Sequence, residues 1–358
     1  MILNLQQGFS AYDIQVDVLA IVRESWRTPE VSWPNVRVMD LGVRHTSLVI
    51  PAVAAYLRRE RPDAILAVRD RAIRAALLAR RLSGVRVKLV GNLHTNLSAA
   101  LEKKPPLLRW LRCQPMRWIY PGVDRIIAVS EGVAQDILKI TGLPKERVVA
   151  IPNPVIGADL FAKSRQPAEH PWFADGGPPV ILGSGRLTEQ KDFSTLIRAF
   201  ASVRAQRECR LVILGEGGLR AQLEALVAEL KLGTSVSVPG FIANPYPCMA
   251  KSALFVLSSI WEGSPTVLTE ALALGVPVVA TDCPSGPRET LAGGRYGRLV
   301  PMGDQQHLAE AMLETLRHPP DPAVLRGAVE AFTIERSARG YLDSLGLENC
   351  APLPCGSS

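Results

Sequence analysis

The chain has 358 residues, of which 47% are hydrophobic and 21% charged, and its formal net charge is +7. This length exceeds what one hydrophobic core usually supports, so the sequence predicts two domains. The apolar content excludes a disordered chain, and no apolar run approaches the roughly 20 residues needed to span a bilayer. The start of the chain has neither the basic segment nor the cleavage site of a signal peptide.

The charge is divided unevenly along the chain. Residues 1–152 contain 23 Lys and Arg against 13 Asp and Glu, whereas residues 153–358 contain 18 against 21. This excess predicts an anionic partner for the first half. No helix-turn-helix, zinc-finger or RNA-binding pattern accompanies it, so nucleic acid is not expected. The six cysteines and five histidines lack metal-ligand spacing, which predicts reduced thiols in the cytoplasm and no metal site.

Short β-rich runs alternate with amphipathic helical stretches in both halves, a pattern typical of doubly wound α/β sheets. In the first half we expect, in chain order, a strand at Gln15–Val22, a helix at Ser47–Glu60, a strand at Ala64–Val68, a helix at Arg71–Leu82, strands at Val87–Gly91 and Arg125–Val129, and a helix at Gly132–Ile140. In the second half we expect helices between strands at Pro179–Gly183, Cys209–Leu214, Val236–Pro239, Leu254–Leu257, Pro277–Ala280 and Gly297–Val300.

Proline and glycine interrupt this alternation near the middle of the chain, at Ile151-Pro-Asn-Pro154 and again over residues 169–179. We therefore predict a first α/β domain over residues 1–160 and a second over residues 161–330, with a hinge near residues 153–178. A C-terminal helix over residues 331–349 could pack back on the first domain. Residues 350–358 are expected to be a disordered tail.

The segment from Lys103 to Tyr120 contains five basic residues and no acidic one, interleaved with Trp110, Trp118 and Tyr120. Cations and interfacial aromatics together are typical of a segment that contacts an anionic membrane surface. The alternative is an ordinary surface helix whose aromatics pack inward. Pro115 also argues against one continuous amphipathic helix.

A further motif, Ser258-Ser-Ile-Trp-Glu-Gly-Ser-Pro-Thr-Val-Leu-Thr-Glu270, follows the apolar strand predicted at Leu254–Leu257. Serine is a favoured N-cap and proline suits the first helical position, so Ser264-Pro-Thr predicts a helix start whose amides can bind an anion. Two carboxylates, Glu262 and Glu270, flank this start and could accept hydrogen bonds from sugar hydroxyls. An isolated pair of glutamates would more often be solvated surface charge.

Four other loops contain polar or glycine residues after predicted strands. Arg186 and Lys191 lie in Gly183-Ser-Gly-Arg-Leu-Thr-Glu-Gln-Lys191, where they could neutralise a diphosphate. An isolated pair of this kind would more often be solvated charge on the protein surface. Gly215-Glu-Gly217 and Gly240-Phe-Ile242 follow the next two strands. His94 follows a strand of the first domain, at the edge where open α/β sheets bind ligands, although a lone histidine is usually structural or merely exposed.

The second half resembles retaining nucleotide-sugar glycosyltransferases of family 4, in the branch that builds bacterial surface glycans. The resemblance lies in Gly-Arg-Leu-x-x-x-Lys-x-Phe at residues 185–193, in the two glutamates eight positions apart, and in the following Gly275-Val-Pro-Val-Val279. It implies the GT-B fold, in which two Rossmann-like domains face a cleft. It also implies that the second domain binds the activated donor and the first binds the acceptor.

The resemblance implies roles for individual residues. Those implied in catalysis are Glu262, Arg186, Lys191 and His94. Those implied in substrate binding are Gly185, Gly215, Gly217, Phe241, Ile242, Gly263, Ser264, Pro265, Thr266, Val267 and Glu270. No metal or other cofactor is expected, because Arg186 and Lys191 would supply the positive charge.

One departure from the family pattern concerns the first domain. Family members begin with a strand and a Gly-Gly loop, whereas this chain opens on Met1-Ile-Leu-Asn-Leu-Gln-Gln, which is typical of the helix that follows that loop. The central strand of the first sheet is thus expected to be missing, which would leave two neighbours unpaired. Either the start codon is placed too late, the reading favoured here, or the protein is a shortened form.

The function expected is a retaining, metal-independent glycosyltransferase. It would move a sugar from a nucleotide diphosphate donor, with UDP favoured, to a lipid-linked or surface-glycan acceptor, in the cytoplasm or peripherally on the inner face of the plasma membrane. The alternative is a truncated, non-catalytic donor-binding or scaffold relative. A nicotinamide-dependent oxidoreductase is disfavoured, because Thr188 stands where the dinucleotide fingerprint requires a third glycine.

Overall fold

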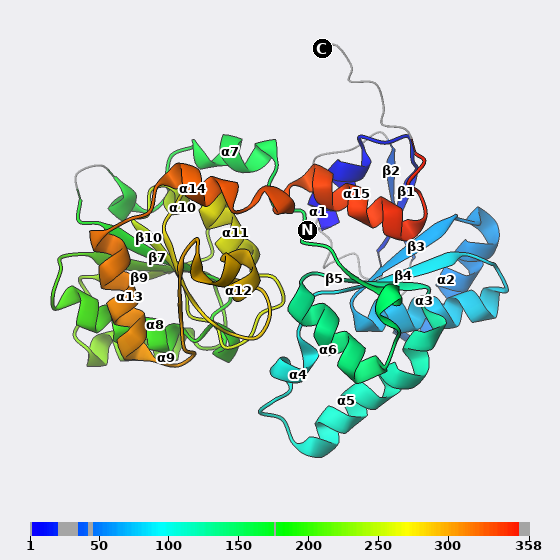
Figure 1. Cartoon of the computed structure of the whole chain (residues 1–358), viewed down its shortest axis with the longest axis horizontal. Coiled ribbons are helices and arrows are strands. Elements are labelled where there is room, and N and C mark those ends of the chain that lie inside the picture. The colour runs from blue at the N-terminus through cyan, green and yellow to red at the C-terminus, as the bar shows by residue number, and fades with distance from the viewer. Residues whose placement is uncertain (1, 21–34, 42–45, 175–176, 351–358) are drawn as a thin grey trace, which may run out of the picture. The chain divides into compact units, whose positions relative to one another are not determined.

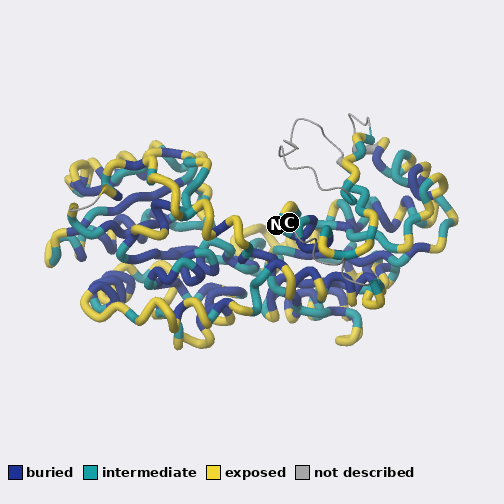
Figure 2. Tube along the Cα trace, turned by 90° about the horizontal axis from the view of Figure 1, so that it is seen from above, coloured by how far each residue is buried: buried dark blue, intermediate teal, exposed yellow. Residues whose placement is uncertain are grey.

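The computed structural model describes residues 2–20, 35–41, 46–174 and 177–350 (Figure 1). It forms two compact units. The first contains the described parts of Met1–Pro154 and Ile334–Ser358, and the second contains those of Val155–Thr333. In each unit the buried strands lie inside and the exposed turns lie at the rim (Figure 2).

The first unit contains two parallel sheets, ordered β1-β2 and β3-β4-β5-β6 within the described residues. Its helices and strands are α1 (Ile2–Phe9), β1 (Val16–Ala20), β2 (Val36–Asp40), α2 (Thr46–Glu60), β3 (Ala64–Val68), α3 (Asp70–Ser83), β4 (Lys88–Leu93), α4 (Leu97–Ala100), α5 (Pro106–Ile119), β5 (Arg125–Ala128), α6 (Glu131–Thr141), β6 (Val148–Ala150) and α15 (Ile334–Leu345).

The second unit has one parallel six-stranded sheet, ordered β12-β11-β10-β7-β8-β9. Its helices and strands are α7 (Ala158–Ser164), β7 (Val180–Ser184), α8 (Phe193–Arg204), β8 (Arg210–Leu214), α9 (Arg220–Glu229), β9 (Val236–Gly240), α10 (Tyr246–Ala250), β10 (Leu254–Leu257), α11 (Thr266–Ala273), β11 (Val278–Thr281), α12 (Pro287–Thr290), β12 (Arg298–Val300), α13 (Gln305–Arg317) and α14 (Pro322–Gly327).

Both faces of the second sheet are buried, as its nearly continuous apolar strands require. Successive residues of a strand point to opposite faces, and Ile181 therefore belongs to one core with α8, α9 and α13. Leu182 belongs to a second core on the opposite face, with α10, α11 and α14. This double covering leaves the ends of the strands as the accessible part of the sheet.

The unit boundaries differ slightly from the predicted ones. The structure ends the first unit after Pro154 instead of after residue 160, because the amides of Val155 and Ile156 both donate to the carbonyl of Phe332 in the second unit. The C-terminal helix α15 belongs to the first unit, where it packs on α1 and on β3, β4 and β5. Of the predicted tail, residues 351–358 lie outside the described residues, as do residues 21–22 of the first predicted strand.

The first unit has a sheet edge with the composition of an interior strand. Within the described residues, β1 pairs only with β2, and β3 pairs only with β4. Strand β3 reads Ala-Ile-Leu-Ala-Val68, which is typical of a strand with neighbours on both sides. The sequence predicted two unpaired neighbours here. Two strands the sequence did not reveal, β2 and β6, complete these sheets.

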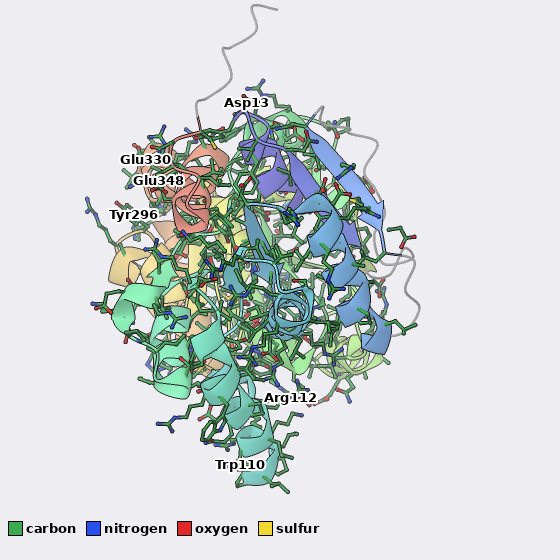
Figure 3. The ribbon with its side chains drawn as sticks, turned by 90° about the vertical axis from the view of Figure 1, so that its right-hand side faces the viewer. Asp13, Trp110, Arg112, Tyr296, Glu330 and Glu348 are labelled. Carbon is green, nitrogen blue, oxygen red and sulfur yellow. The ribbon has the colours of Figure 1, made fainter. Side chains whose placement is uncertain are left out.

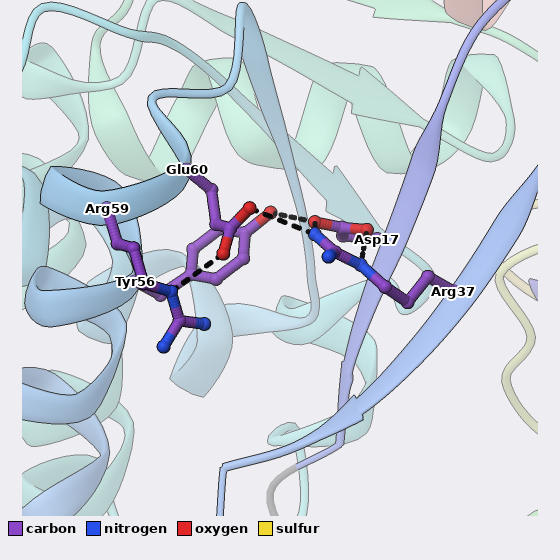
Figure 4. A network of polar contacts seen from close by, with 5 residues as sticks. All are labelled: Asp17, Arg37, Tyr56, Arg59 and Glu60. Atoms are coloured by element: carbon purple, nitrogen blue, oxygen red, sulfur yellow. Dashed lines mark hydrogen bonds and ion pairs between the residues drawn. The ribbon is translucent and has the colours of Figure 1, made fainter.

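Polar contacts connect the two-stranded sheet to α2 (Figure 4). Arg37 of β2 donates two hydrogen bonds to Asp17 of β1, at 2.8 and 2.6 Å, and one to Glu60 of α2, at 3.1 Å. The hydroxyl of Tyr56, also on α2, donates to Asp17 at 2.7 Å. The Arg37 guanidinium thereby lowers the pKa of the Asp17 carboxyl. The network adds polar anchors to the apolar contacts of Leu19 and Met39 with α2.

Candidate functional site

The order in which the chain adds strands to the second sheet reverses between β7 and β10. Strand β7 comes first in this unit and is central in the sheet, with β8 and β9 on one side and β10, β11 and β12 on the other. Loops that leave the carboxyl ends of β7 and β10 therefore run to opposite faces of the sheet, where α8 and α11 pack. Open α/β sheets bind ligands at this topological switch point.

An ion pair occupies the switch point. Lys191 follows β7 and Glu262 follows β10, and Lys191 Nζ lies 2.6 Å from Glu262 Oε1. Only 14% of the lysine side chain and 8% of the glutamate side chain are exposed. The hydroxyl of Ser259 donates to the same Oε1 at 2.7 Å, and within the described residues no hydrogen bond or ion pair involves Oε2. This arrangement leaves the second carboxylate oxygen available for a ligand hydroxyl.

Backbone and side-chain bonds hold the two loops in place. The amide of Ile260 donates to the carbonyl of Gln190 at 2.9 Å, and the Gln190 side chain donates to the carbonyl of Trp261 at 2.9 Å. The hydroxyl of Ser258 donates to the carbonyl of Lys191 at 2.7 Å. These reciprocal bonds fix both ends of the ion pair, which is the support that an ordered site requires.

Glycines allow the turns after β7 and β8 to touch. Gly215 has φ +138°, and a Cβ added to it would lie 1.9 Å from the carbonyl oxygen of Gly185. A Cβ on Gly217 would lie 2.3 Å from the carbonyl oxygen of Leu187. Backbone bonds join the same turns, from Gly185 to Leu214 and from Leu187 to Glu216. Gly215 and Gly217 are thus places where only glycine fits without displacement of the backbone.

Two predicted residues lie exposed near these turns. Arg186 follows Gly185 and is exposed, and Phe241 follows β9 with 77% of its surface exposed, while Ile242 packs partly against the apolar core. A large aromatic side chain with this exposure is not held by packing. It is therefore available to a ligand, as is the Arg186 guanidinium, which has no hydrogen bond or ion pair to any residue that the structure describes.

The predicted helix start after Gly263 is nearly correct, but its cap is not. Helix α11 begins at Thr266, and Pro265 takes the N-cap position without a side-chain hydrogen bond, so the predicted capping by Ser264 is wrong. Pro265 instead packs against Gly286, whose added Cβ would lie 2.5 Å from Pro265 Cδ. The amides of Thr266 and Val267 have no intrahelical partner and remain an anion site in principle, whereas those of Leu268 and Thr269 both donate to the carbonyl of Pro265.

Glu270 lies in the second turn of α11 and belongs to a different contact. The hydroxyl of Tyr246, at the start of α10, donates to Glu270 Oε1 at 3.3 Å. Burial raises the pKa of Glu270 to about 7, and the hydrogen bond from Tyr246 opposes this shift. Within the described residues, no hydrogen bond or ion pair joins Glu270 to Glu262. Glu262 and Glu270 therefore belong to two separate groups of polar contacts in the second unit.

His94 lies in the first unit, directly after β4. Its Nε2 is hydrogen-bonded to Asn92 Oδ1, while Asn92 Nδ2 donates to Tyr341 Oη at 2.9 Å and to the carbonyl of Ile127 at 3.4 Å. Since the Asn92 amide directs its oxygen at the ring, Nε2 must hold the proton and Nδ1 is an acceptor. Burial, with help from Arg69, lowers the pKa of His94 to about 4, so the ring is neutral near pH 7.

The structure brings together Gly185, Lys191 and Glu262, and it joins the Gly215 and Gly217 turns to the same edge. It places Glu270 in its own contact, and His94 in the other unit. Sequence reasoning missed Ser259, Tyr246, Asn92 and Tyr341. The sequence indicates Ser259 and Asn92 only weakly, because each lies at or near the end of a predicted strand and a few positions before a predicted site residue, Glu262 or His94. Tyr341 had none, since its contact spans 249 positions.

Within the described residues, no three His, Cys, Asp or Glu side chains are grouped so that they could hold a metal ion. The described helices include none with the length and apolar character needed to cross a membrane.

Two parallel α/β units, one with a basic and acidic pair at its switch point, define a protein of two Rossmann-like domains. Residues 164–330 match the family model described as glycosyl transferases group 1, and residues 1–154 match the model described as glycosyl transferase 4-like domain. The chain belongs to this glycosyltransferase family, of the GT-B fold.

Named relatives agree with this assignment. The chain is 34% identical over 194 residues to a Campylobacter jejuni N-acetylgalactosamine-N,N'-diacetylbacillosaminyl-diphospho-undecaprenol 4-alpha-N-acetylgalactosaminyltransferase, covering 54% of this chain and 51% of the relative. It is 28% identical over 304 residues to the Rhizobium meliloti lipopolysaccharide core biosynthesis glycosyltransferase LpsE, covering 83% and 79%. The chain thus spans about half the length of the first of these relatives.

A solved structure gives the same fold. Anabaena HepE, crystallised in complex with UDP, superimposes with a TM-score of 0.70 at 22% identity, covering 87% of this chain and 86% of HepE.

Proposed function

We propose that this protein is a retaining, metal-independent glycosyltransferase that moves a sugar from a UDP-linked donor to a lipid-linked or surface-glycan acceptor. The observation that carries the proposal is the Lys191–Glu262 pair, held at the switch point of the second sheet by Ser259 and by the Gln190 loop. Membership of the family, and relatives named for surface-glycan synthesis, support the choice of reaction and acceptor.

The donor diphosphate would bind between Arg186, Lys191 and the first amides of α11. Departure of the nucleotide leaves negative charge on the β-phosphate, and fixed positive groups aimed at that position lower the barrier. Two side-chain cations and a helix start can supply this stabilisation, so the proposal needs no metal ion. The bound UDP of HepE, a protein of the same fold, supports UDP as the nucleotide.

Glu262 would hold the donor sugar and Glu270 the ribose. Lys191 pairs with Glu262 Oε1, so an incoming phosphate would share the lysine while a sugar hydroxyl bonds to Oε2. Glu270 would accept ribose hydroxyls beside Tyr246. Neutral His94, with Nδ1 as an acceptor, suits a hydroxyl group better than a phosphate.

Retention of configuration would proceed on one face of the sugar. The acceptor would attack from the side that the diphosphate leaves, and a phosphate oxygen would take the acceptor proton. This route requires no second carboxylate at the reacting carbon. Glu270 is hydrogen-bonded to Tyr246 and, within the described residues, has no hydrogen bond or ion pair with Glu262, so it is not assigned as a second carboxylate at that carbon.

The experiment is a panel of nucleotide sugars incubated with the full chain, with nucleotide release as the readout. We expect release from one UDP-sugar, and at least a hundredfold slower release for Lys191→Ala and for Glu262→Ala, a loss typical of a removed electrostatic contact. Lys163→Ala, from an exposed ion pair with Asp159, is the matched control and should keep full activity. Undiminished release by the two site variants would overturn the assignment.

Two measurements separate the finer parts of the proposal. Excess EDTA should leave the rate unchanged, and NMR of the first product should show the anomeric configuration of the donor. Inhibition by EDTA would refute metal independence, and an inverted product would refute retention. Neither result would affect the donor site.

A donor-binding protein without transferase activity is the second candidate. It is favoured by the first unit, where β3 is a sheet edge of interior composition within the described residues. UDP binding that depends on Lys191, without release from any donor and acceptor pair, would establish it.

We also propose that the protein acts in the cytoplasm, peripherally on the inner face of the plasma membrane, where a lipid-linked acceptor would be reached. Its basic first unit would make the contact.

A further inference from the structure

Helix α5 exposes large apolar side chains to solvent. Leu107 is 68% exposed, Trp110 57%, Leu111 52% and Trp118 77%. The first two turns of the helix are exposed at every position. Figure 3 shows α5 projecting from the first unit with Trp110 at its outer end. Contiguous apolar surface of this kind marks an interaction site on a soluble protein.

The exposed residues form a stripe along the helix. At about 100° per residue, Leu107, Leu111 and Trp118 lie within roughly 40° of one another, and Trp110 lies beside them. Met116 points to the opposite side and is buried against the first core. The helix is continuous from Pro106 to Ile119, so the expected break at Pro115 is wrong. Proline removes one bond to the carbonyl of Leu111, which lies on the exposed side where solvent can replace it.

Neighbouring elements do not cover this stripe. Within the described residues, α5 has extensive contacts only with α6 and with the short turn at Tyr120–Gly122 that follows it. The alternative of an inward-packed surface helix is therefore excluded for Trp110 and Trp118, which are exposed. It holds for Tyr120, which is fully buried.

The charge around the stripe has one sign. Lys103, Lys104, Arg112 and Arg117 are exposed, and none of them forms an ion pair with a residue of the described part of the chain. Arg109 donates to the main-chain carbonyls of Lys104, at 2.9 Å, and Glu102, which fixes the segment that precedes the helix. Tryptophans beside unpaired cations complement a surface that has an apolar interior and anionic head groups.

We propose that this face of α5, defined by Leu107, Trp110, Leu111 and Trp118 with the cations around it, inserts into the surface of an anionic phospholipid bilayer. The inference deepens the proposed function, because a lipid-linked acceptor lies in such a surface, but lipid binding itself does not require the donor site. The helix lies in the interface with its apolar stripe among the upper acyl chains, and the cations contact phosphate groups.

The test is co-sedimentation of the full chain with vesicles of phosphatidylcholine alone and of phosphatidylcholine with 30% phosphatidylglycerol. We expect binding to the anionic vesicles, weakened about fivefold for each cation removed in Arg112→Gln and Arg117→Gln, and strongly reduced by added salt. Trp110→Ala combined with Trp118→Ala should reduce binding at least tenfold. Leu78→Ala with Leu82→Ala, two exposed leucines of α3, is the matched control and should not change it.

Two further measurements keep the result interpretable. Brominated lipids should quench tryptophan emission of the unmodified chain, and less in Trp110→Ala with Trp118→Ala. Nucleotide release from a soluble donor should survive in this variant, which shows that it is folded and separates loss of docking from failure of the donor site. Equal binding to both vesicle types, or tryptophan variants that bind like the control, would overturn the proposal. So would a chain whose own dimerisation, measured without lipid, depends on Trp110 and Trp118.

Discussion

Replacing Lys191 by methionine should leave the Glu262 carboxylate buried without a counter-charge. Within the described residues, the Ser259 hydroxyl would then be its remaining side-chain partner. Methionine keeps most of the volume of the lysine stem, so the change removes the charge and little packing. Glu262 is 8% exposed on its side chain and lies 2.6 Å from the lysine nitrogen. A carboxylate in such a position depends on its counter-charge to offset the free energy lost on leaving water.

The magnitude follows from that burial. Removing one partner of a buried ion pair destabilises a protein by about 3 kcal/mol or more. For a unit of this size, each kcal/mol lowers the melting temperature by about 2–4 °C, so the second unit should melt roughly 6–12 °C lower. Lys191→Met combined with Glu262→Gln removes both charges and should recover most of the loss.

Differential scanning calorimetry of the full chain measures this, with separate fits for the two units. Lys163→Met, from the exposed pair with Asp159, should change the melting temperature by about 1 °C or less, since such pairs contribute little. The reasoning is refuted if Lys191→Met behaves like this control, or if the double variant is no more stable than the single one.

Three other predictions follow from local geometry. Gly215→Ala should lower the melting temperature by several degrees, because its Cβ would meet the carbonyl of Gly185, whereas Gly218→Ala has open space and should not. Between about pH 4.5 and pH 7 the folded chain retains a proton on Glu270 that the unfolded chain has released, so stability should fall as pH rises through this window. Calorimetry of Glu270→Gln should lack that part of the slope. In proton NMR, the His94 ring should not titrate between about pH 5 and pH 8, and a midpoint near 6.5 would contradict its buried, neutral state.

Much of the second unit could be predicted from the sequence. Each strand there is short, apolar and bounded by glycine, proline or polar residues, so its position is encoded locally, and the Leu254–Leu257 strand matches its predicted limits. The loops that follow carry the glycines and charges of the site. Strands β2 and β6 were missed because β2, Val-Arg-Val-Met-Asp40, mixes apolar and charged residues and β6 has only three residues.

Contacts between distant positions could not be predicted. The bond between Ser259 and Glu262 is local and could have been guessed from their spacing, but the partners of Glu270 and Asn92 come from other elements. The same limit explains the N-cap error. Ser264 is a good capping residue by type, yet the packing of Pro265 against Gly286 determines where α11 begins.

The assignment of α15 to the first unit has a consequence for synthesis on the ribosome. Residues 155–333 form the second unit without interruption, so it can complete its fold as soon as they have emerged. The first unit cannot, because one face of its sheet is covered by α1 and by α15, which is translated last. The N-terminal half therefore emerges first and completes its fold last, and its exposed apolar surface during that interval is where a chaperone should bind.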